Sequence, residues 1–273
     1  MADTAPTAPI VVGVDGSQAA INAALWAIDE AVARDVPLRI VHVLGAEEDP
    51  AAPADTFRIE IQYAESSMRA ATAAVKDTDK PVKIETDILW GPVTTGLINE
   101  SQDAAMVCVG SVGIGEVARE LFGSTAATLA EKAHCPVAII RTTHVKPVAR
   151  PDWIVVVVDE DSDNDTVVEF AMNEARLRRA PILAVGVPDE DFGETPYDEL
   201  DRRLEKWKHR YPDVHVYPVG TSAGIAGFLG ANTDESVQLA VVGRADAYEA
   251  AQIIGPHSHP ILRHGECSVL IVR

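Results

Sequence analysis

The residue types that could do chemistry in this chain are concentrated in residues 109–125, where glycine and hydroxyl side chains follow an apolar run. Six of them form the pattern: Gly110, Gly113, Gly115, Gly123, Ser124 and Thr125. Glycine lets the backbone turn sharply and approach a ligand closely, and the free amides at the start of a helix suit a phosphate group. The stretch therefore predicts an anion site between a strand end and a helix that Ser124 or Thr125 caps. The spacing of the glycines does not by itself distinguish this anion site from two ordinary loops of an α/β domain.

The composition narrows the classes of partner. The chain has 273 residues, with 23 Lys and Arg against 42 Asp and Glu, which gives a formal net charge of −19. Such a surface argues against nonspecific binding to nucleic acid or to an anionic membrane. No apolar run approaches the roughly 20 residues that cross a bilayer, and the N-terminal residues carry no signal core. We therefore expect a cytoplasmic protein, in which Cys108, Cys135 and Cys267 are buried reduced thiols.

Strands and helices alternate in the first half of the chain. Strands are predicted at residues 10–14, 38–44, 82–89, 104–109 and 135–140, and a helix follows each of the first four. Ser17 is placed to cap the first helix. The inward face of that helix is predicted to hold six apolar residues: Ile21, Ala24, Leu25, Ile28, Ala31 and Val32. This alternation predicts βαβ units in a doubly wound parallel sheet.

The second half of the chain repeats the first. Three pairs coincide under a shift of 144 residues: Asp15 with Asp159, Glu30 with Glu174, and Pro37 with Pro181. Near the far end the shift has fallen to 132, so the second copy has lost residues between its second and fifth strands. We therefore expect two domains, residues 1–143 and 152–273, joined by a linker that contains prolines.

A sheet with the strand order 3-2-1-4-5 would bring three of these strand ends together. Ligands of open parallel sheets bind past the carboxyl ends of the strands, where the strand order reverses. Asp15 follows the first strand, Val43 lies near the end of the second, and Gly110 ends the fourth. We therefore expect a phosphate against residues 110–113 and the helix start at Ser124, with Asp15 and the backbone around Val43 at the nucleoside end.

The pattern G-x2-G-x9-G-[ST] resembles the ATP-binding signature of the universal stress protein family. In this chain it is formed by Gly110, Gly113, Gly123 and Ser124. The V-G-V-D-G-S run around Asp15, the His42-Val43 pair and the H-C-P-V run before the last strand of the first half also resemble that family. The likeness covers essentially the whole chain, which is similar to tandem two-domain members of actinobacterial, and in particular mycobacterial, type.

The resemblance implies two tandem doubly wound, five-stranded parallel-sheet domains, related in fold to the adenine nucleotide alpha hydrolases. It also implies ATP bound with Mg²⁺, homodimers, and a regulatory role in stress or dormancy through a protein partner that the sequence does not identify. The expected nucleotide-binding set is Gly13, Asp15, Val43, Gly110, Gly113, Gly123, Ser124 and Thr125. No catalytic residue and no metal-ligating side chain is expected.

The second copy departs from the family's pattern at the corresponding stretch. Gly243 ends its fourth strand, but Asp246 stands where the next glycine of the pattern would be. Gly255 follows one residue early, and Pro256 replaces the hydroxyl residue. Asp246 would place negative charge near the phosphates, and proline removes an amide donor from the helix start. We therefore expect one ATP site per chain, in the N-terminal half.

Other chemistries fit the sequence less well. No GxxxxGK[ST] run is present, and the order G-S-V-G-I-G differs from the dinucleotide fingerprint GxGxxG. No nucleophile–base constellation can be assigned from spacing, so we expect no enzyme, although a bound metal nucleotide can hydrolyse slowly without a dedicated base. His257 and His259 are interpreted as exposed polar residues rather than a metal site. Trp90-Gly91-Pro92 is interpreted as a turn with a packed aromatic rather than a base-stacking platform.

Two classes of function stay open at this point. The first is a regulatory protein that binds ATP, with a cyclic-AMP-binding regulator as a variant that the motif does not distinguish. The second is a nucleotide-independent dimeric scaffold. Arg119 is the only cation within residues 109–125, so backbone amides and a metal ion would carry most of the phosphate recognition.

Overall fold

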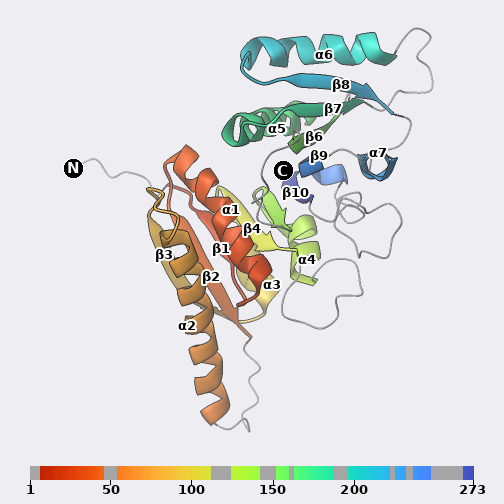
Figure 1. Ribbon diagram of the computed structural model, residues 1–273. Helices are drawn as coiled ribbons and strands as arrows, with labels where there is room; N and C mark the ends of the chain where they lie inside the picture. The colour runs from red at the N-terminus through yellow and green to blue at the C-terminus, as the bar shows by residue number, and fades with distance from the viewer. Residues whose placement is uncertain are drawn as a thin grey trace. The chain divides into compact units, whose positions relative to one another are not determined.

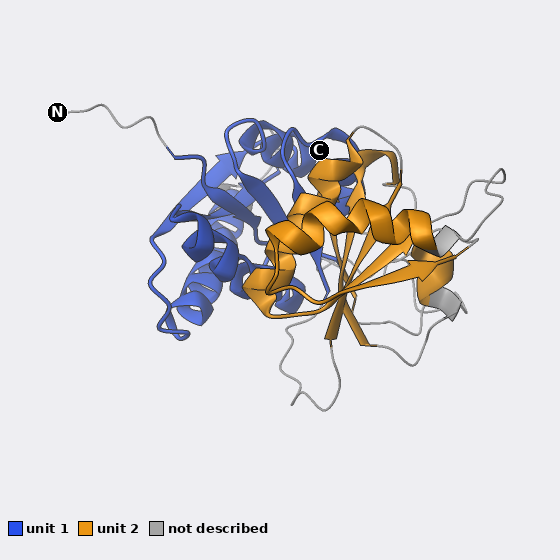
Figure 2. Cartoon of the chain, turned by 90° about the horizontal axis from the view of Figure 1, so that it is seen from above, with its two compact units in different colours: residues 1–143 blue, residues 144–273 orange. Residues whose placement is uncertain are grey.

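The chain folds as two compact units, residues 1–143 and 144–273, which Figure 2 shows in different colours. The structure is a computed structural model. It describes these parts of the chain: residues 7–45, 54–111, 124–141, 152–159, 163–186, 196–221, 225–231, 236–246 and 267–273. No helix among these residues is both long enough and apolar enough to cross a membrane.

Unit 1 contains a parallel sheet whose strand order is β3-β2-β1-β4-β5 (Figure 1). Its strands are β1 (Ile10–Gly13), β2 (Leu38–Leu44), β3 (Ile84–Trp90), β4 (Met106–Gly110) and β5 (Val137–Ile140). β1 pairs in parallel with β2 on one side and with β4 on the other, so the order in which successive strands are added reverses at β1. The order 3-2-1-4-5 predicted from the sequence is therefore confirmed in this unit.

Helices cover both faces of this sheet. They are α1 (Gln18–Arg34), α2 (Ala54–Lys76), α3 (Val93–Glu100) and α4 (Ser124–Lys132). Successive side chains of a strand point to opposite faces. In β2, the His42 ring lies beside Tyr63 of α2, whereas the next side chain, Val43, contacts Gly96 of α3. The helices α2 and α3 therefore lie on opposite sides of the sheet.

Helix α1 begins as the sequence predicts, but its buried face differs from the predicted one. Ser17 is the N-cap, and its side chain accepts a hydrogen bond from the amide of Ala20. The buried face consists mainly of small residues: Ala20, Asn22, Ala23, Ala24, Ala27, Ile28, Glu30 and Ala31. Ile21 and Leu25 are only half-buried, and Val32 is exposed. The predicted face was wrong in these three positions, because alanines let α1 approach the sheet closely and thus decide which side faces inward.

Unit 2 has the same strand order, β8-β7-β6-β9-β10. Its strands are β6 (Asp152–Val158), β7 (Ile182–Gly186), β8 (Val216–Gly220), β9 (Ser236–Gly243) and β10 (Ser268–Val272). Its described helices are α5 (Asn164–Arg178), α6 (Pro196–Arg210), α7 (Ile225–Ala231) and the short 3-10 helix η1 (Arg244–Asp246). The two units are thus tandem copies of one α/β fold.

The register of the strands locates the residues that the second copy has lost. Leu38 of β2 pairs with Ile84 of β3, and the corresponding pair in unit 2 is Ile182 with Val216. The repeat shift is 144 at β7 and already 132 at β8, so the missing residues lie between these two strands. Helix α2 has 23 residues and its counterpart α6 has 15.

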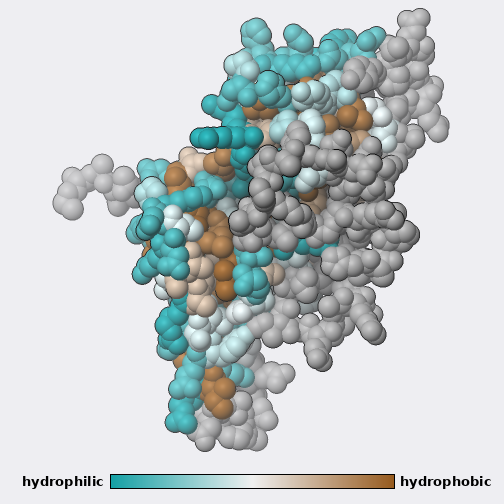
Figure 3. All heavy atoms as spheres, viewed as in Figure 1, coloured by the Kyte–Doolittle hydropathy of each residue, from teal (hydrophilic) through white to brown (hydrophobic). Residues whose placement is uncertain are grey.

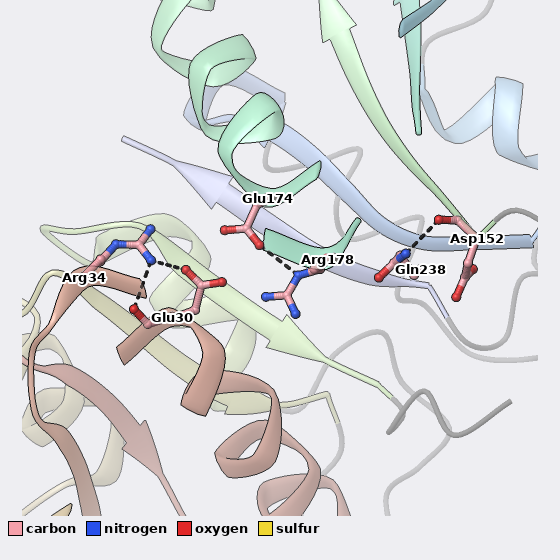
Figure 4. A network of polar contacts seen from close by, with 6 residues as sticks. All are labelled: Glu30, Arg34, Asp152, Glu174, Arg178 and Gln238. Atoms are coloured by element: carbon pink, nitrogen blue, oxygen red, sulfur yellow. Dashed lines mark hydrogen bonds and ion pairs between the residues drawn. The ribbon is translucent and has the colours of Figure 1, made fainter. Parts of the chain in front are cut away.

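Both copies bury an ion pair at the same place in their first helix. Figure 4 shows Glu30 paired with Arg34 in α1 and Glu174 paired with Arg178 in α5. The glutamate side chains are 0% and 1% exposed, and each arginine follows its partner by four residues, which places both on one helix face. The repeat that the sequence shows at Glu30 and Glu174 is thus a repeat of buried charge. Cys108, Cys135 and Cys267 are all buried, as predicted.

Candidate functional site

The loop after β1 holds Asp15 in a fixed turn. Its Oδ1 accepts hydrogen bonds from the amide of Ser17 at 3.0 Å and from the Ser17 hydroxyl at 2.6 Å. Gly16 has a φ of +86°, a conformation that favours glycine. A Cβ added there would lie 2.6 Å from the Tyr63 hydroxyl, which donates to the Asp15 carbonyl at 2.9 Å. Helix α2 therefore closes over this loop and holds the Asp15 backbone in place.

The end of β2 contributes a buried imidazole, His42, and the half-buried Val43. Val43 is half-buried, with its side chain against α3. The neighbouring His42 is 7% exposed, and its Nδ1 is buried without a hydrogen-bond partner. Burial lowers the pKa of the His42 imidazole below its ordinary value of 6.5, while a hydrogen bond to the Val14 backbone and the charge of Asp15 act in the opposite direction. The ring is therefore neutral at pH 7.

The end of β4 meets the start of α1. A Cβ built on Gly110 would lie 2.7 Å from the carbonyl carbon of Ala19 and 2.9 Å from its carbonyl oxygen. A side chain at this position would collide with helix backbone, so Gly110 is required by the packing of α1 on the sheet. Gly13, at the end of β1, is less restricted, because an added Cβ would meet the Leu97 side chain at 3.1 Å.

The described part of helix α4 starts at Ser124 and includes both hydroxyl residues. The Ser124 side chain is exposed and that of Thr125 is half-buried. The carbonyl of Ser124 accepts a hydrogen bond from the Thr128 hydroxyl at 2.8 Å. Gly113 and Gly123 lie outside the described residues, as does Arg119.

The strand pairing brings three of the expected site residues to one edge of unit 1. Because β1 lies between β2 and β4 and all three strands are parallel, Asp15, Val43 and Gly110 lie at their carboxyl ends. Tyr63 also belongs to this group, and the sequence analysis missed it. Its hydroxyl contact with Asp15 spans 48 residues of sequence, so no local pattern could reveal it.

The same edge of unit 2 is built from different side chains. Asp246 lies in η1, directly after β9, and its Oδ2 would be 3.6 Å from a Cβ on Gly243. Gly186 takes the place of His42 in unit 2. A Cβ added to Gly186 would lie 3.1 Å from the Leu200 side chain. The second copy thus has a carboxylate beside its fourth strand and leucine beside its second. His257 and His259 lie outside the described residues, which contain no cluster of three or more metal-ligating side chains.

A parallel sheet with this strand order, covered by helices on both faces, defines the class of doubly wound α/β proteins. Residues 7–141 match the model of the universal stress protein family. A universal stress protein of Mycobacterium tuberculosis is 52% identical over 265 residues, which cover 97% of this chain and 96% of the relative. The chain belongs to the universal stress protein family.

Further relatives agree with this assignment. A second universal stress protein of Mycobacterium tuberculosis is 39% identical over 267 residues, covering 96% of this chain and 95% of the relative. Among solved structures, a universal stress protein from Archaeoglobus fulgidus superposes with a TM-score of 0.72 at 14% identity, covering 98% of this chain and 96% of its own. The resemblance read from the sequence is therefore confirmed at the level of family and fold.

Proposed function

We propose that this protein is a regulator that binds one ATP per chain, at the carboxyl edge of the sheet in unit 1. The contrast between the two copies carries the proposal. Unit 1 presents Asp15, Val43 and Gly110 at adjoining strand ends, whereas unit 2 places the Asp246 carboxylate beside its fourth strand. A carboxylate at that position would repel a triphosphate.

The residues divide into two groups by what they offer a nucleotide. At the nucleoside end, the Asp15 carboxylate and the backbone of Gly13 and Val43 offer hydrogen-bonding groups. At the phosphate end, the proposed ligands are the backbone and hydroxyl groups of five residues: Gly110, Gly113, Gly123, Ser124 and Thr125. The first turn of α4 adds amide groups and the positive end of the helix dipole, which suit an anion.

Mg²⁺ belongs to the proposal as the counter-ion of the triphosphate. The described residues contain no cluster of three or more carboxylate, histidine or cysteine side chains that could form a metal cage. This fits a Mg²⁺ ion held largely by phosphate oxygens and water, which is its usual arrangement with nucleotides. Bound there, the ion would neutralise phosphate charge in a chain of net charge −19.

Isothermal titration calorimetry of the full chain with ATP and Mg²⁺ tests the proposal. We expect one site per chain, and weaker binding by at least tenfold for Asp15→Ala and for Gly113→Asp. A Gly243→Ala variant is the matched control and should bind as the wild type does. Two equal sites per chain would contradict the assignment to unit 1. Undiminished affinity in excess chelator would contradict the role of Mg²⁺.

The other functions have distinct outcomes in the same experiment. A wild-type chain that binds no nucleotide at millimolar ATP, and releases none when denatured for mass spectrometry, is a nucleotide-independent scaffold. Tighter binding of cyclic AMP than of ATP makes it a cyclic-AMP regulator. Homodimer formation, a cytoplasmic location, a role in stress or dormancy and the absence of rapid ATP turnover are further parts of the proposal, and family membership supports them.

A further inference from the structure

Helix α2 is longer than the strands that it covers. Its 23 residues span about 34 Å, whereas the seven residues of β3 span about 23 Å. Figure 1 shows the N-terminal end of α2 projecting beyond the carboxyl ends of β2 and β3. The first turns of α2 therefore stand above the edge of the sheet at which the proposed nucleotide site lies.

The projecting turns continue the inward stripe of α2. Ala64 and Ala71 are 0% exposed and face the sheet, and Phe57 lies seven residues before Ala64, which places it on the same side of the helix. Phe57 is nevertheless 53% exposed. Hydrophobic surface is visible at this end of α2 in Figure 3, where Ile59 is also exposed.

The last residue of β3 meets Phe57 at this edge. The rings of Phe57 and Trp90 are stacked, with centroids 5.3 Å apart and planes 23° from parallel. Trp90 is still 56% exposed, so the turn at Trp90-Gly91 does not pack its aromatic away as the sequence analysis expected. Gly91, at a φ of +121°, donates its amide to the Leu44 carbonyl at 3.0 Å and so ties the turn to the end of β2.

This aromatic pair is adjacent to the nucleoside end of the proposed site. Trp90 is paired with Leu44 in the β2–β3 register, one residue beyond Val43, and neighbouring strands lie about 4.8 Å apart. On α2, Phe57 precedes Tyr63 by six residues, or about 9 Å along the helix axis, and Tyr63 contacts Asp15. Both exposed rings therefore lie at the same edge of the sheet as Asp15 and the Val43 backbone.

The described residues of unit 2 include no counterpart of this feature. Under the shift of 132 that holds at β8, the first residue of α6, Pro196, corresponds to Ala64 of α2. The described part of unit 2 therefore contains no helical turns equivalent to those that carry Phe57 and Tyr63.

We propose that Phe57 and Trp90 form a base-stacking surface that selects a purine at the nucleotide site of unit 1. This inference rests on the proposed function and adds a specificity determinant to it. Aromatic faces stack on any base, and the larger purine ring system gains more contact than a pyrimidine does. Stacking of a base on an aromatic side chain contributes about 1–3 kcal/mol, which corresponds to an affinity change of about 5- to 150-fold.

The test compares ATP, CTP and inorganic tripolyphosphate as ligands of the full chain. In Trp90→Ala and Phe57→Ala, we expect ATP affinity to fall by about 5- to 150-fold, the preference for ATP over CTP to shrink, and tripolyphosphate affinity to stay unchanged. Trp90→Phe should retain most of the ATP affinity. Tyr217→Ala is the matched control, because Tyr217 is 51% exposed and lies edge-on to Trp153 in unit 2. It should bind ATP as the wild type does.

Fluorescence gives an independent readout. ATP should quench the indole emission of the wild type, and Trp90→Phe should abolish that quenching although three other tryptophans remain. Wild-type ATP affinity in both alanine variants, with binding lost in Asp15→Ala, would leave the proposed function standing and overturn the stacking surface. A parallel loss of ATP and tripolyphosphate affinity, or a change of oligomeric state with ATP affinity intact, would also overturn it. Absence of nucleotide binding by the wild type would overturn both proposals.

Discussion

Replacing Gly110 by alanine tests whether this glycine serves the packing of α1. The added Cβ would lie 2.7 Å from the Ala19 carbonyl carbon, 2.8 Å from its Cβ and 2.9 Å from its carbonyl oxygen. Two of these atoms belong to helix backbone, so relief requires a shift of the first turn of α1 rather than a new side-chain rotamer. Gly243→Ala is the matched control, because its Cβ would meet Val167 and Asp246 side-chain atoms at 3.5 and 3.6 Å, which is ordinary contact.

The two substitutions should therefore differ in their effect on stability. Overpacking of a rigid contact costs about 1–3 kcal/mol. Replacing glycine by alanine also restricts the unfolded chain, which stabilises both variants by about 0.4–1 kcal/mol. We expect Gly110→Ala to be destabilised by roughly 1–2 kcal/mol, and Gly243→Ala to be neutral or slightly stabilised.

Urea unfolding followed by circular dichroism gives the overall change in midpoint. Hydrogen exchange with mass spectrometry assigns this change to one unit, because exchange reports the opening of each segment separately. Exchange should accelerate in peptides of α1 and β1 in Gly110→Ala, while those of α5 and β6 keep their wild-type rates. Equal stability of the two variants would refute the argument that α1 backbone, rather than a ligand alone, demands glycine at this strand end.

Three further predictions concern buried and exposed charges. Glu174→Gln should lower the urea midpoint more than Glu30→Gln does, because the paired Arg178 is only 10% exposed whereas Arg34 is 29% exposed. Lys206→Ala removes an ion pair with Asp165 in which both side chains are largely exposed, at 56% and 64%, so we expect the free energy of unfolding to change by less than about 1 kcal/mol. A larger loss would contradict the interpretation of this pair as a weak surface interaction. The lowered pKa of His42 means that the unfolded chain binds a proton more readily than the folded one, so its contribution to stability is full above pH 6.5 and declines as pH falls below that value. Urea midpoints measured between pH 5 and 8 should therefore fall less steeply toward acid in His42→Phe than in the wild type.

Much of the fold could be predicted because it is encoded in local patterns. The strand at 38–44 has the bounds that periodicity predicted, and Ser17 caps α1 as expected. The repeat predicted two copies of one fold, since each copy keeps its own alternation of strands and helices. The family could be recognised from the spacing of glycine and hydroxyl residues, because that spacing is local as well.

The site was predicted less completely, since its contacts join residues that are far apart in the sequence. Asp15, Val43 and Gly110 were placed together only by assuming a strand order, which the pairing of β1 with β2 and β4 now supplies. Tyr63 was missed because nothing in its neighbours indicates that its hydroxyl meets the Asp15 carbonyl. The inward face of α1 was misjudged, since close packing favours alanine where a hydrophobicity pattern favours isoleucine and leucine.

The glycine-rich stretch 109–125 shows which properties follow from the sequence and which follow only from the tertiary structure. The sequence by itself determined the family, the tandem repeat and the difference between Gly113 and Asp246, because residue identity and spacing along the chain are sufficient for these. Only the tertiary structure decided that Gly110 lies against the backbone of Ala19 and that Phe57 stands exposed beside Trp90. These two facts depend on how closely α1 approaches the sheet and how far α2 extends beyond it, and such distances are set by packing between elements rather than by the order of residues within them.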